Sequence, residues 1–323
     1  MWSWWRAYVT PFQDPADELD EGAVEEQMET EIPIPPRELV PLDPADQLSA
    51  SEALPTTFLF ARGSTELFLS ADGNELAVAS IAFGAEAPSF IESIVPIDDN
   101  QALIGVCCEP AFGNQQLLNI DAGTLESLGF NSSFPSISPD GITVVSSGLT
   151  LVAQDLEPVL RQSEAVDRAD AVVDLEQSDN GDFFRTAVLP NSTVAASDGD
   201  SIELIDLSGQ LVASSSLEGA QAVVYDERNR VVIALVTTGP APDSGNILGD
   251  QVVLLHPETL ETIGEVDIDA QATSIDVHEG WILLSHPDGT ITARTITGSE
   301  GVTVSSDGRE AAWLPVDTES EVG

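Results

Sequence analysis

The stretch "SISPDGITVVSSG", residues 136–148, joins a tight polar turn to a run rich in β-branched residues. An Asp-Gly pair accepts the positive φ angles of a short hairpin turn, and a preceding Ser hydroxyl can bond the turn backbone. Variants of this pattern recur as "LSADGNELAVAS" from Leu69, "AASDGDSIELID" from Ala195, "SHPDGTITARTI" from Ser285 and "VSSDGREAAWLP" from Val304. We therefore predict a series of hairpins in which each turn leads into a buried strand.

Strand-length segments fill most of the chain from Thr57 onward. Runs rich in Val, Ile, Leu and Thr alternate with Gly, Asp, Asn, Ser and Pro, and helical periodicity is almost absent. Strand–turn–strand units open at Leu117, Ile202 and Val252, about one or two blade repeats of 40–50 residues apart. A length of about 260 residues suits a propeller of four-stranded blades better than a single β-sandwich. The pattern predicts an all-β fold, a β-propeller of four-stranded blades, six or seven in number.

The turn motif also supports a family resemblance. Ser-x-Asp-Gly followed by x-x-Leu-Ala-Val resembles the repeats of TolB-like and YVTN-type β-propellers, which are relatives of WD-repeat blades. The segment "LLHPETLETIGEVDI" from Leu254 is similar to the YVTN pattern. The resemblance covers roughly residues 57–315 and implies a fold rather than a particular function, and the irregular spacing around residues 160–195 departs from it.

The first part of the chain differs from the rest in composition. Residues 10–54 hold thirteen acidic residues, a single basic residue (Arg37) and the segment "IPIPPRELVPLDP". A proline-rich chain of like charges cannot bury enough apolar surface to fold, and it extends. We expect residues 1–54 to form a disordered acidic stalk or linker, residues 55–316 the propeller, and residues 317–323 a disordered tail.

The charge balance is strongly acidic. The chain has 56 Asp and Glu residues against 10 basic ones, all arginine, for a net charge of −46. Such a surface repels phosphate backbones, so we expect no nucleic-acid partner. Two interpretations of the charge remain: a halophilic adaptation that keeps the protein hydrated at high ionic strength, or a surface dedicated to cations or a cationic partner.

Common catalytic motifs are absent from the sequence. It has no Gly-x-Ser-x-Gly elbow, Walker loop, His-Glu-x-x-His or Cys-x-x-Cys motif. We interpret His256, His278 and His286 as turn or packing residues. The adjacent Cys107 and Cys108 are interpreted as small apolar residues of a buried strand, the alternative being a strained ring closed by a disulfide.

Acidic clusters are the remaining candidates for a metal site. The segment "VVDLEQSDNGDFF" brings together oxygen ligands of the kind that Ca²⁺ prefers, with candidate ligands Asp174, Glu176, Asp179 and Asp182. The alternative is a solvated acidic loop. We give that second interpretation to the acidic residues of "DIDAQATSID", namely Asp267, Asp269 and Asp276. No other cofactor is expected.

The leading functional hypothesis is a non-enzymatic binding or scaffold propeller that acts through its blade-connecting loops. We expect it outside the cytoplasm or at the cell surface, although a cytoplasmic location stays open. Three tryptophans beside Arg6 in "MWSWWRAYV" suit a membrane interface, so a membrane tether near the N-terminus is one interpretation and a disordered end is another. The alternative function is a propeller hydrolase or lactonase with carboxylates or a metal at the central channel. The ligand and the partner are not identified by the sequence.

Overall fold

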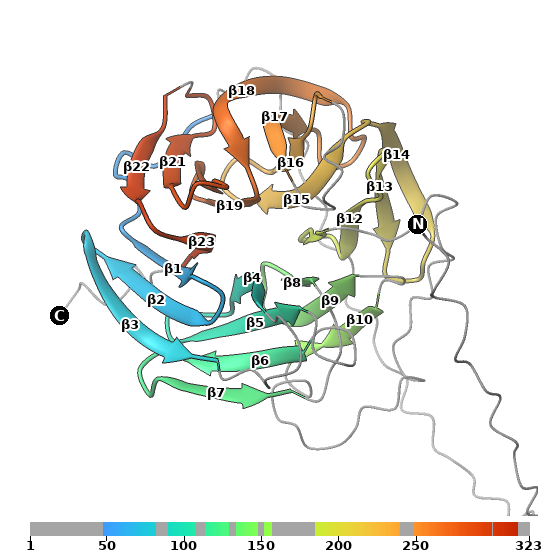
Figure 1. The fold of residues 1–323 in the computed structure, drawn as a ribbon. Coiled ribbons are helices and arrows are strands. Elements are labelled where there is room, and N and C mark those ends of the chain that lie inside the picture. The colour runs from blue at the N-terminus through green and yellow to red at the C-terminus, as the bar shows by residue number, and fades with distance from the viewer. Residues whose placement is uncertain are drawn as a thin grey trace, which may run out of the picture. The chain divides into compact units, whose positions relative to one another are not determined.

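The computed structural model describes residues 48–81, 90–107, 114–128, 134–147, 152–156, 185–239, 248–298 and 300–315. All of them belong to one unit, Pro36–Gly323. Their strands form five four-stranded sheets and one three-stranded sheet, which follow one another around a ring (Figure 1). Within this part of the chain, no helix is long and apolar enough to cross a membrane.

The first half of the ring contains two four-stranded blades and the three-stranded sheet. Blade 1, from its inner strand outwards, consists of β23 (Arg309–Trp313), β1 (Thr57–Arg62), β2 (Glu66–Ala71) and β3 (Asn74–Ser80). Blade 2 consists of β4 (Phe90–Pro96), β5 (Gln101–Cys107), β6 (Asn114–Asn119) and β7 (Thr124–Ser127). Sheet 3 consists of β8 (Phe134–Ile137), β9 (Thr143–Ser147) and β10 (Val152–Asp155).

The second half of the ring contains three four-stranded blades. Blade 4 consists of β11 (Ala187–Val188), β12 (Thr193–Ser197), β13 (Ser201–Asp206) and β14 (Leu211–Ser216). Blade 5 consists of β15 (Ala220–Asp226), β16 (Val231–Val236), β17 (Gly249–Leu255) and β18 (Thr262–Ala272). Blade 6 consists of β19 (Ser274–His278), β20 (Trp281–Ser285), β21 (Ile291–Thr295) and β22 (Val302–Ser305).

The ring is closed by pairing between the two ends of the folded chain. Strand β23 lies antiparallel to β1, with Phe58 opposite Trp313 and Leu59 opposite Ala312. In Figure 1 the red β23 therefore lies beside the blue β1. The Phe58 and Trp313 rings meet edge to face with their centroids 5.7 Å apart. Blade 1 thus takes its inner strand from the C-terminal end of the folded region.

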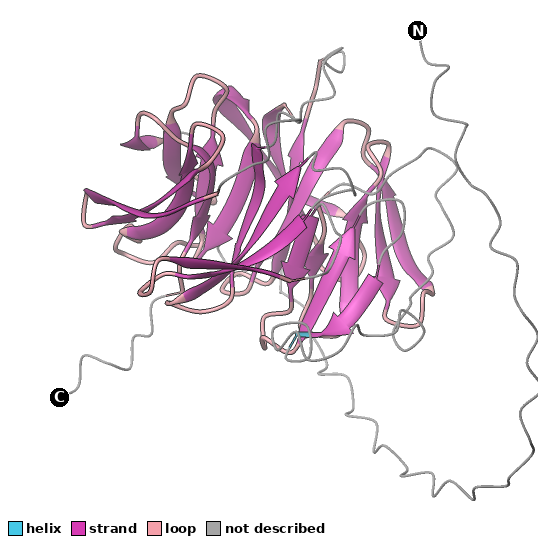
Figure 2. Cartoon of the chain, turned by 60° about the horizontal axis from the view of Figure 1, so that its bottom comes forward, coloured by secondary structure: helices cyan, strands magenta, loops and turns pink. Residues whose placement is uncertain are grey.

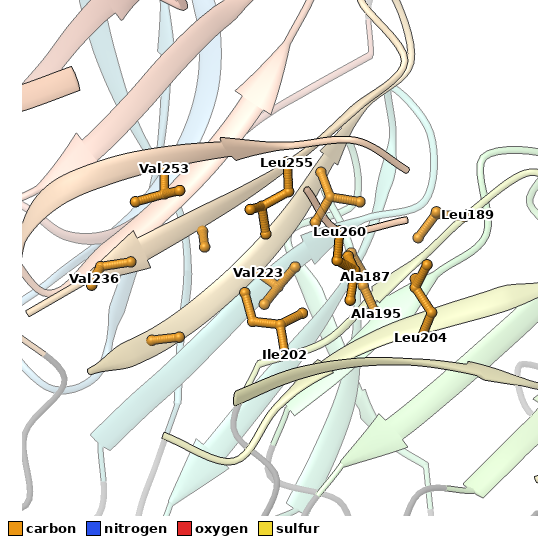
Figure 3. Packing of buried hydrophobic residues seen from close by; sticks show 13 residues of the cluster. Ala187, Leu189, Ala195, Ile202, Leu204, Val223, Val236, Val253, Leu255 and Leu260 are labelled. Atoms are coloured by element: carbon orange, nitrogen blue, oxygen red, sulfur yellow. The ribbon is translucent and has the colours of Figure 1, made fainter. Parts of the chain in front are cut away.

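The hydrophobic core is divided among the contacts between neighbouring sheets. Because successive strand side chains point to opposite faces, each middle strand offers apolar residues to the sheet on either side. Six buried clusters result, one for each pair of neighbours around the ring. Figure 3 shows the cluster between blades 4 and 5, in which Ile202 and Leu204 share a core with Val223 and Val253. Burying one such side chain contributes about 1.5–3 kcal/mol.

The predicted all-β propeller is confirmed, and its blade composition needs a correction. Five blades of four strands are described, rather than six or seven, and the further sheet has three described strands. Sheet 3 nevertheless packs on both sides like a blade, since Val144 lies in a cluster with blade 2 and Val145 in a cluster with blade 4. Figure 2 shows the strands of all the sheets in magenta.

The Ser-x-Asp-Gly segments form turns. The Asp140 carboxylate accepts hydrogen bonds from Ser138 Oγ at 2.5 Å and from the Ile142 amide at 3.1 Å, and Gly141 has a φ of 70°. The strand after the turn is not always buried, however. Asp72 and Gly73 lead into β3, an outer strand that is largely exposed, so the predicted burial is wrong there because the turn occurs at different positions within different blades.

Two further segments bear on the sequence-based expectations. Cys107, the last residue of β5, is disulfide-bonded, so its interpretation as a free apolar residue is wrong. Residues 48–54, placed in the predicted stalk, contact the propeller: the Ser49 amide donates to Asn229 Oδ1 at 2.8 Å, and Trp281 Nε1 donates to the Ser51 carbonyl at 3.1 Å. The remainder of the stalk, residues 1–47, and the tail from residue 317 lie outside the described residues.

Candidate functional site

A cavity of about 380 Å³ lies inside the ring, lined by the innermost strand of every described sheet or by residues adjoining it. These inner strands are β4, β8, β11, β15, β19 and β23. The cavity reaches the turns that follow β8, β15 and β19, where Pro139, Glu227 and Glu279 line it. A concave site that every sheet helps to build is held in place by the whole ring.

Arg185 links several sheets at this cavity. It precedes β11 by two residues, and its Nη2 donates to the Glu310 carboxylate of blade 1 and, at 3.0 Å, to the Glu92 carbonyl of blade 2. Its guanidinium lies 5.5 Å from the centre of the Phe134 ring in sheet 3. The side chains of Arg185 and Glu310 are 15% and 14% exposed, so this is a mostly buried ion pair.

Both glutamates beside Arg185 occupy β-bulges of inner strands. In blade 1 the register shifts between Phe60 and Ala61, which pair with Ala311 and Arg309 and leave Glu310 without an opposite residue. In blade 2 the same happens to Glu92, between Ile91 and Ser93. A bulge redirects the side chain of its extra residue. Glu310 also has a φ of 39°, a conformation that costs a non-glycine residue about 1–3 kcal/mol and often marks a functional site.

Asp276 of β19 lines the cavity, as does Glu310. It accepts a hydrogen bond of 2.7 Å from the Trp313 amide. Burial raises the pKa of Asp276 to about 6, against the opposing effect of that hydrogen bond and of Arg185. Burial likewise raises the pKa of Glu92 to about 7, with Arg185 opposing the rise and Glu310 adding to it. The pKa of Glu310 is also raised, because the effect of burial exceeds the opposing effect of Arg185.

Two buried polar atoms of the cavity lining lack hydrogen-bond partners among the described residues. They are the Tyr225 hydroxyl and the Arg185 Nε. Burial raises the pKa of Tyr225 to about 12, so its phenol stays protonated at neutral pH. Buried polar groups are normally paired. Both atoms are enclosed by the protein, although their residues line the cavity.

The structure separates the acidic residues that the sequence grouped together. Asp267 and Asp269 lie on the outer strand β18 and are exposed, whereas Asp276 lines the cavity, so the interpretation of Asp276 as part of a solvated loop is wrong. The outer strand of blade 5, β18, is followed directly along the chain by β19, the inner strand of blade 6. The calcium candidates Asp174, Glu176, Asp179 and Asp182 lie outside the described residues.

The described histidines differ in their surroundings. His286 contacts the Gln271 carbonyl and Thr292 Oγ1, each at 2.8 Å, and is buried. His256 accepts a 3.2 Å hydrogen bond from the Glu258 amide in the β17–β18 turn. His278 instead lines the cavity. Among the residues that the structure describes, no three His, Cys, Asp or Glu side chains are placed to hold a metal ion.

The sequence analysis did not select Glu92, Arg185 or Glu310, although a signal was present. Each is a charged residue next to an apolar run, in "FIESIVP", "FFRTAV" and "REAAWLP". A charged residue at or just before the start of a buried strand is expected to have a partner of opposite charge. What the sequence lacks is any sign of which strand is innermost in its blade.

Comparison with solved structures gives the same architecture. A chain from the crystal structure of a nidogen/laminin complex has a TM-score of 0.58 and 10% identity, over 79% of this chain and 97% of that chain. A Bacteroides caccae protein of unknown function has a TM-score of 0.52 and 12% identity, over 81% and 100%. These neighbours are β-propellers. The predicted resemblance to propeller repeat proteins is thus confirmed at the level of the fold.

A chain from the mitotic checkpoint complex covers more of this protein, 92%, and 90% of its own length, with a TM-score of 0.50 and 13% identity. At these identities the similarity shows the fold alone. No protein-family model matches the chain, and no curated protein sequence matches it.

Proposed function

We propose that this chain is a non-enzymatic binding propeller whose central cavity holds a small ligand. The observation that supports this proposal is the cavity of about 380 Å³, which is lined by residues of all the described sheets. Small-molecule sites are typically concave, largely preformed and lined by apolar groups with a few polar ones. The cavity is concave and built from preformed strands, and its lining mixes apolar side chains with polar and charged ones in similar measure.

The contacts of the carboxyl groups favour binding over hydrolysis. A glycoside hydrolase needs two carboxyl groups that flank the reacting bond, one of them free to act as a nucleophile or base. Here Glu310 is bound to Arg185, and Asp276 accepts from the Trp313 amide. Glu310 is therefore held in an ion pair, and one oxygen of Asp276 is held by the Trp313 amide.

The proposal also includes the cellular location of the protein and its mode of recognition. An extracytoplasmic location is one part of it. Recognition through blade-connecting loops and a membrane tether near Trp2 are further parts of it. The connecting segments 82–89, 129–133 and 157–184 lie outside the described residues, as does Trp2.

The proposal is tested by filling the cavity. Val224 is half-buried in its wall, and Val224→Trp places a bulky ring there; Val302→Trp makes the same change on the exposed outer strand β22. Ligand-observed NMR with a panel of small amines, carboxylates and sugars should detect saturable binding to the wild type and to Val302→Trp, but not to Val224→Trp, while both variants melt cooperatively. If no ligand binds to the wild type in a way that Val224→Trp abolishes, the proposal is contradicted. Hydrolysis of a simple lactone, followed by acid release and lost in Asp276→Asn, would favour the enzymatic alternative.

A further inference from the structure

We propose that the end of blade 6 at which β19 turns into β20 is a groove for an extended peptide with two leucines six positions apart. Residues 48–54 of this chain, here called the strap, fill the groove as an intramolecular competitor. The strap precedes β1 and belongs to no sheet. It is not among the residues that line the central cavity, so this inference goes beyond the proposed function and is tested without a cavity ligand.

Two leucines of the strap pack on opposite faces of blade 6. Leu48 packs against the buried cluster that blades 5 and 6 share. Leu54 packs against the cluster between blades 6 and 1. Both leucines are half-buried. The strap therefore crosses blade 6 from one face to the other and makes an apolar contact at each end.

Between the leucines, the groove pairs with the backbone of the strap. The Ser49 amide donates to Asn229 Oδ1 at 2.8 Å, and Asn229 Nδ2 donates to the Ser49 carbonyl at 2.9 Å. The Ser51 amide donates to the Glu279 carbonyl at 2.9 Å, and Trp281 Nε1 donates to the Ser51 carbonyl at 3.1 Å. Both backbone groups of alternate residues are paired, as when a peptide adds a strand to a sheet edge. These bonds do not involve the side chains of the strap, so the leucines carry the sequence preference.

The groove side of these contacts is held in place by buried groups. Asn229 is 5% exposed, and its Nδ2 also donates to the carboxylate of Asp226, which is 1% exposed. The other Asp226 oxygen accepts from the Gly280 amide at 3.3 Å. Gly280 has a φ of 78°, and a Cβ placed on it would come within 2.2 Å of the Ser49 carbonyl oxygen. The close approach of the strap therefore requires glycine at this position.

The strap has the properties of a segment that can leave its site. It shares no β-ladder with blade 6 and is held by the four hydrogen bonds and the two half-buried leucines. Segments with few buried contacts open locally while the rest of the fold persists. Release removes these partners from Asn229 Oδ1 and Trp281 Nε1, which favours a replacement. An outside peptide must displace a competitor whose effective concentration is about millimolar, so the wild type should bind it weakly.

Release of the strap is measured in the full chain. The double variant Leu48→Ser, Leu54→Ser should expose the groove. Hydrogen exchange followed by mass spectrometry should show slow exchange of the strap amides in the wild type and in Glu52→Gln, a change at an exposed strap position, but fast exchange in the double variant. All three proteins should melt cooperatively. If the double variant does not fold, Ser49→Pro replaces it, because proline lacks the amide that donates to Asn229.

A labelled peptide of residues 46–56 is the probe for the open groove. About 1 M NaCl limits charge repulsion to about 3 Å, so the net charge of −46 does not mask binding. Fluorescence anisotropy should show the peptide binding at least about tenfold more tightly to the released variant than to the wild type. A peptide with Leu48→Ser and Leu54→Ser should bind at least about tenfold more weakly. A peptide with Glu52→Gln should bind unchanged.

Binding in this pattern supports the peptide groove. A released strap without peptide binding would show that residues 48–54 are only a fixed part of the fold, and would overturn the proposal. Equal binding to the wild type and the released variant, or equal binding of the peptide without leucines, would place the peptide elsewhere and would also overturn it. A strap that stays protected in Leu48→Ser, Leu54→Ser would contradict the role of the two leucines. None of these results depends on whether the central cavity binds a ligand.

Discussion

Gly219 occupies a position where no side chain fits. It lies between β14 and β15 with a φ of 82°, and a Cβ placed on it would come within 2.2 Å of the Thr237 carbonyl oxygen. That carbonyl cannot move freely, because the Thr237 amide donates to the Gly219 carbonyl at 2.8 Å. Gly141 has a similar φ of 70° but open space around it. A substitution at Gly141 therefore introduces backbone strain alone, whereas a substitution at Gly219 introduces both backbone strain and steric overlap.

Alanine at these two glycines should have unequal effects. Gly141→Ala adds the cost of a left-handed residue, about 1 kcal/mol of unfolding free energy. Gly219→Ala adds the overlap with the Thr237 carbonyl and should cost about 3 kcal/mol. Urea denaturation of both variants and the wild type measures the difference. Equal losses of unfolding free energy in the two variants would contradict the close approach of the Thr237 carbonyl to Gly219.

At the scale of the strand, the bulges of β4 and β23 place Glu92 and Glu310 beside Arg185, which donates to the Glu92 carbonyl and to the Glu310 carboxylate. Glu92 holds a proton in the folded protein that the unfolded chain releases, because burial raises its pKa from 4.5 to about 7. The stabilisation from this proton is fully present below the unfolded pKa and is lost as the pH rises through about 7. The shift corresponds to at most about 3 kcal/mol.

Glu92→Gln should therefore flatten the pH dependence of stability. Between about pH 5 and about pH 8 the wild type should lose unfolding free energy, and Glu92→Gln should lose less, so that the variant is the more stable protein at the upper pH. Urea denaturation at each pH measures this. Glu126→Gln, on the exposed outer strand of the same blade, corrects for the general loss of one negative charge. A slope in Glu92→Gln equal to that of Glu126→Gln would refute the buried protonated state of Glu92.

Strands and turns were predictable from local sequence, but the position of a strand within its blade was not. The Asp-Gly pairs and apolar runs follow from φ preferences and side-chain alternation, which act over a few residues. Whether a strand is inner or outer depends on ring closure, in which β23 pairs with β1 across almost the whole folded chain. Asp276 and Asp267 consequently looked alike in sequence, and only the first lines the channel.

At the scale of the whole molecule, the ring and the charge oppose each other. The buried clusters between neighbouring sheets hold the described chain in a closed ring. The net charge of −46 favours an expanded chain, because unfolding moves the carboxylates apart. The described ion pairs of Arg62, Arg185 and Arg228 offset only a small part of that excess. The free energy of unfolding should therefore depend on the distance over which the carboxylates repel one another through the solvent.

Salt should accordingly stabilise the fold. The range of the repulsion falls from about 30 Å at about 0.01 M salt to about 10 Å at about 0.1 M, so the melting temperature should rise steeply with NaCl over this interval and more slowly above it. Calcium chloride at matched ionic strength should have nearly the same effect if the repulsion is distributed over the surface. A calcium ion bound at Asp174, Glu176, Asp179 and Asp182 would instead stabilise in proportion to its site occupancy, at concentrations too low to screen charge. A melting temperature that is flat in NaCl but rises with trace calcium would contradict the distributed repulsion and support the calcium site.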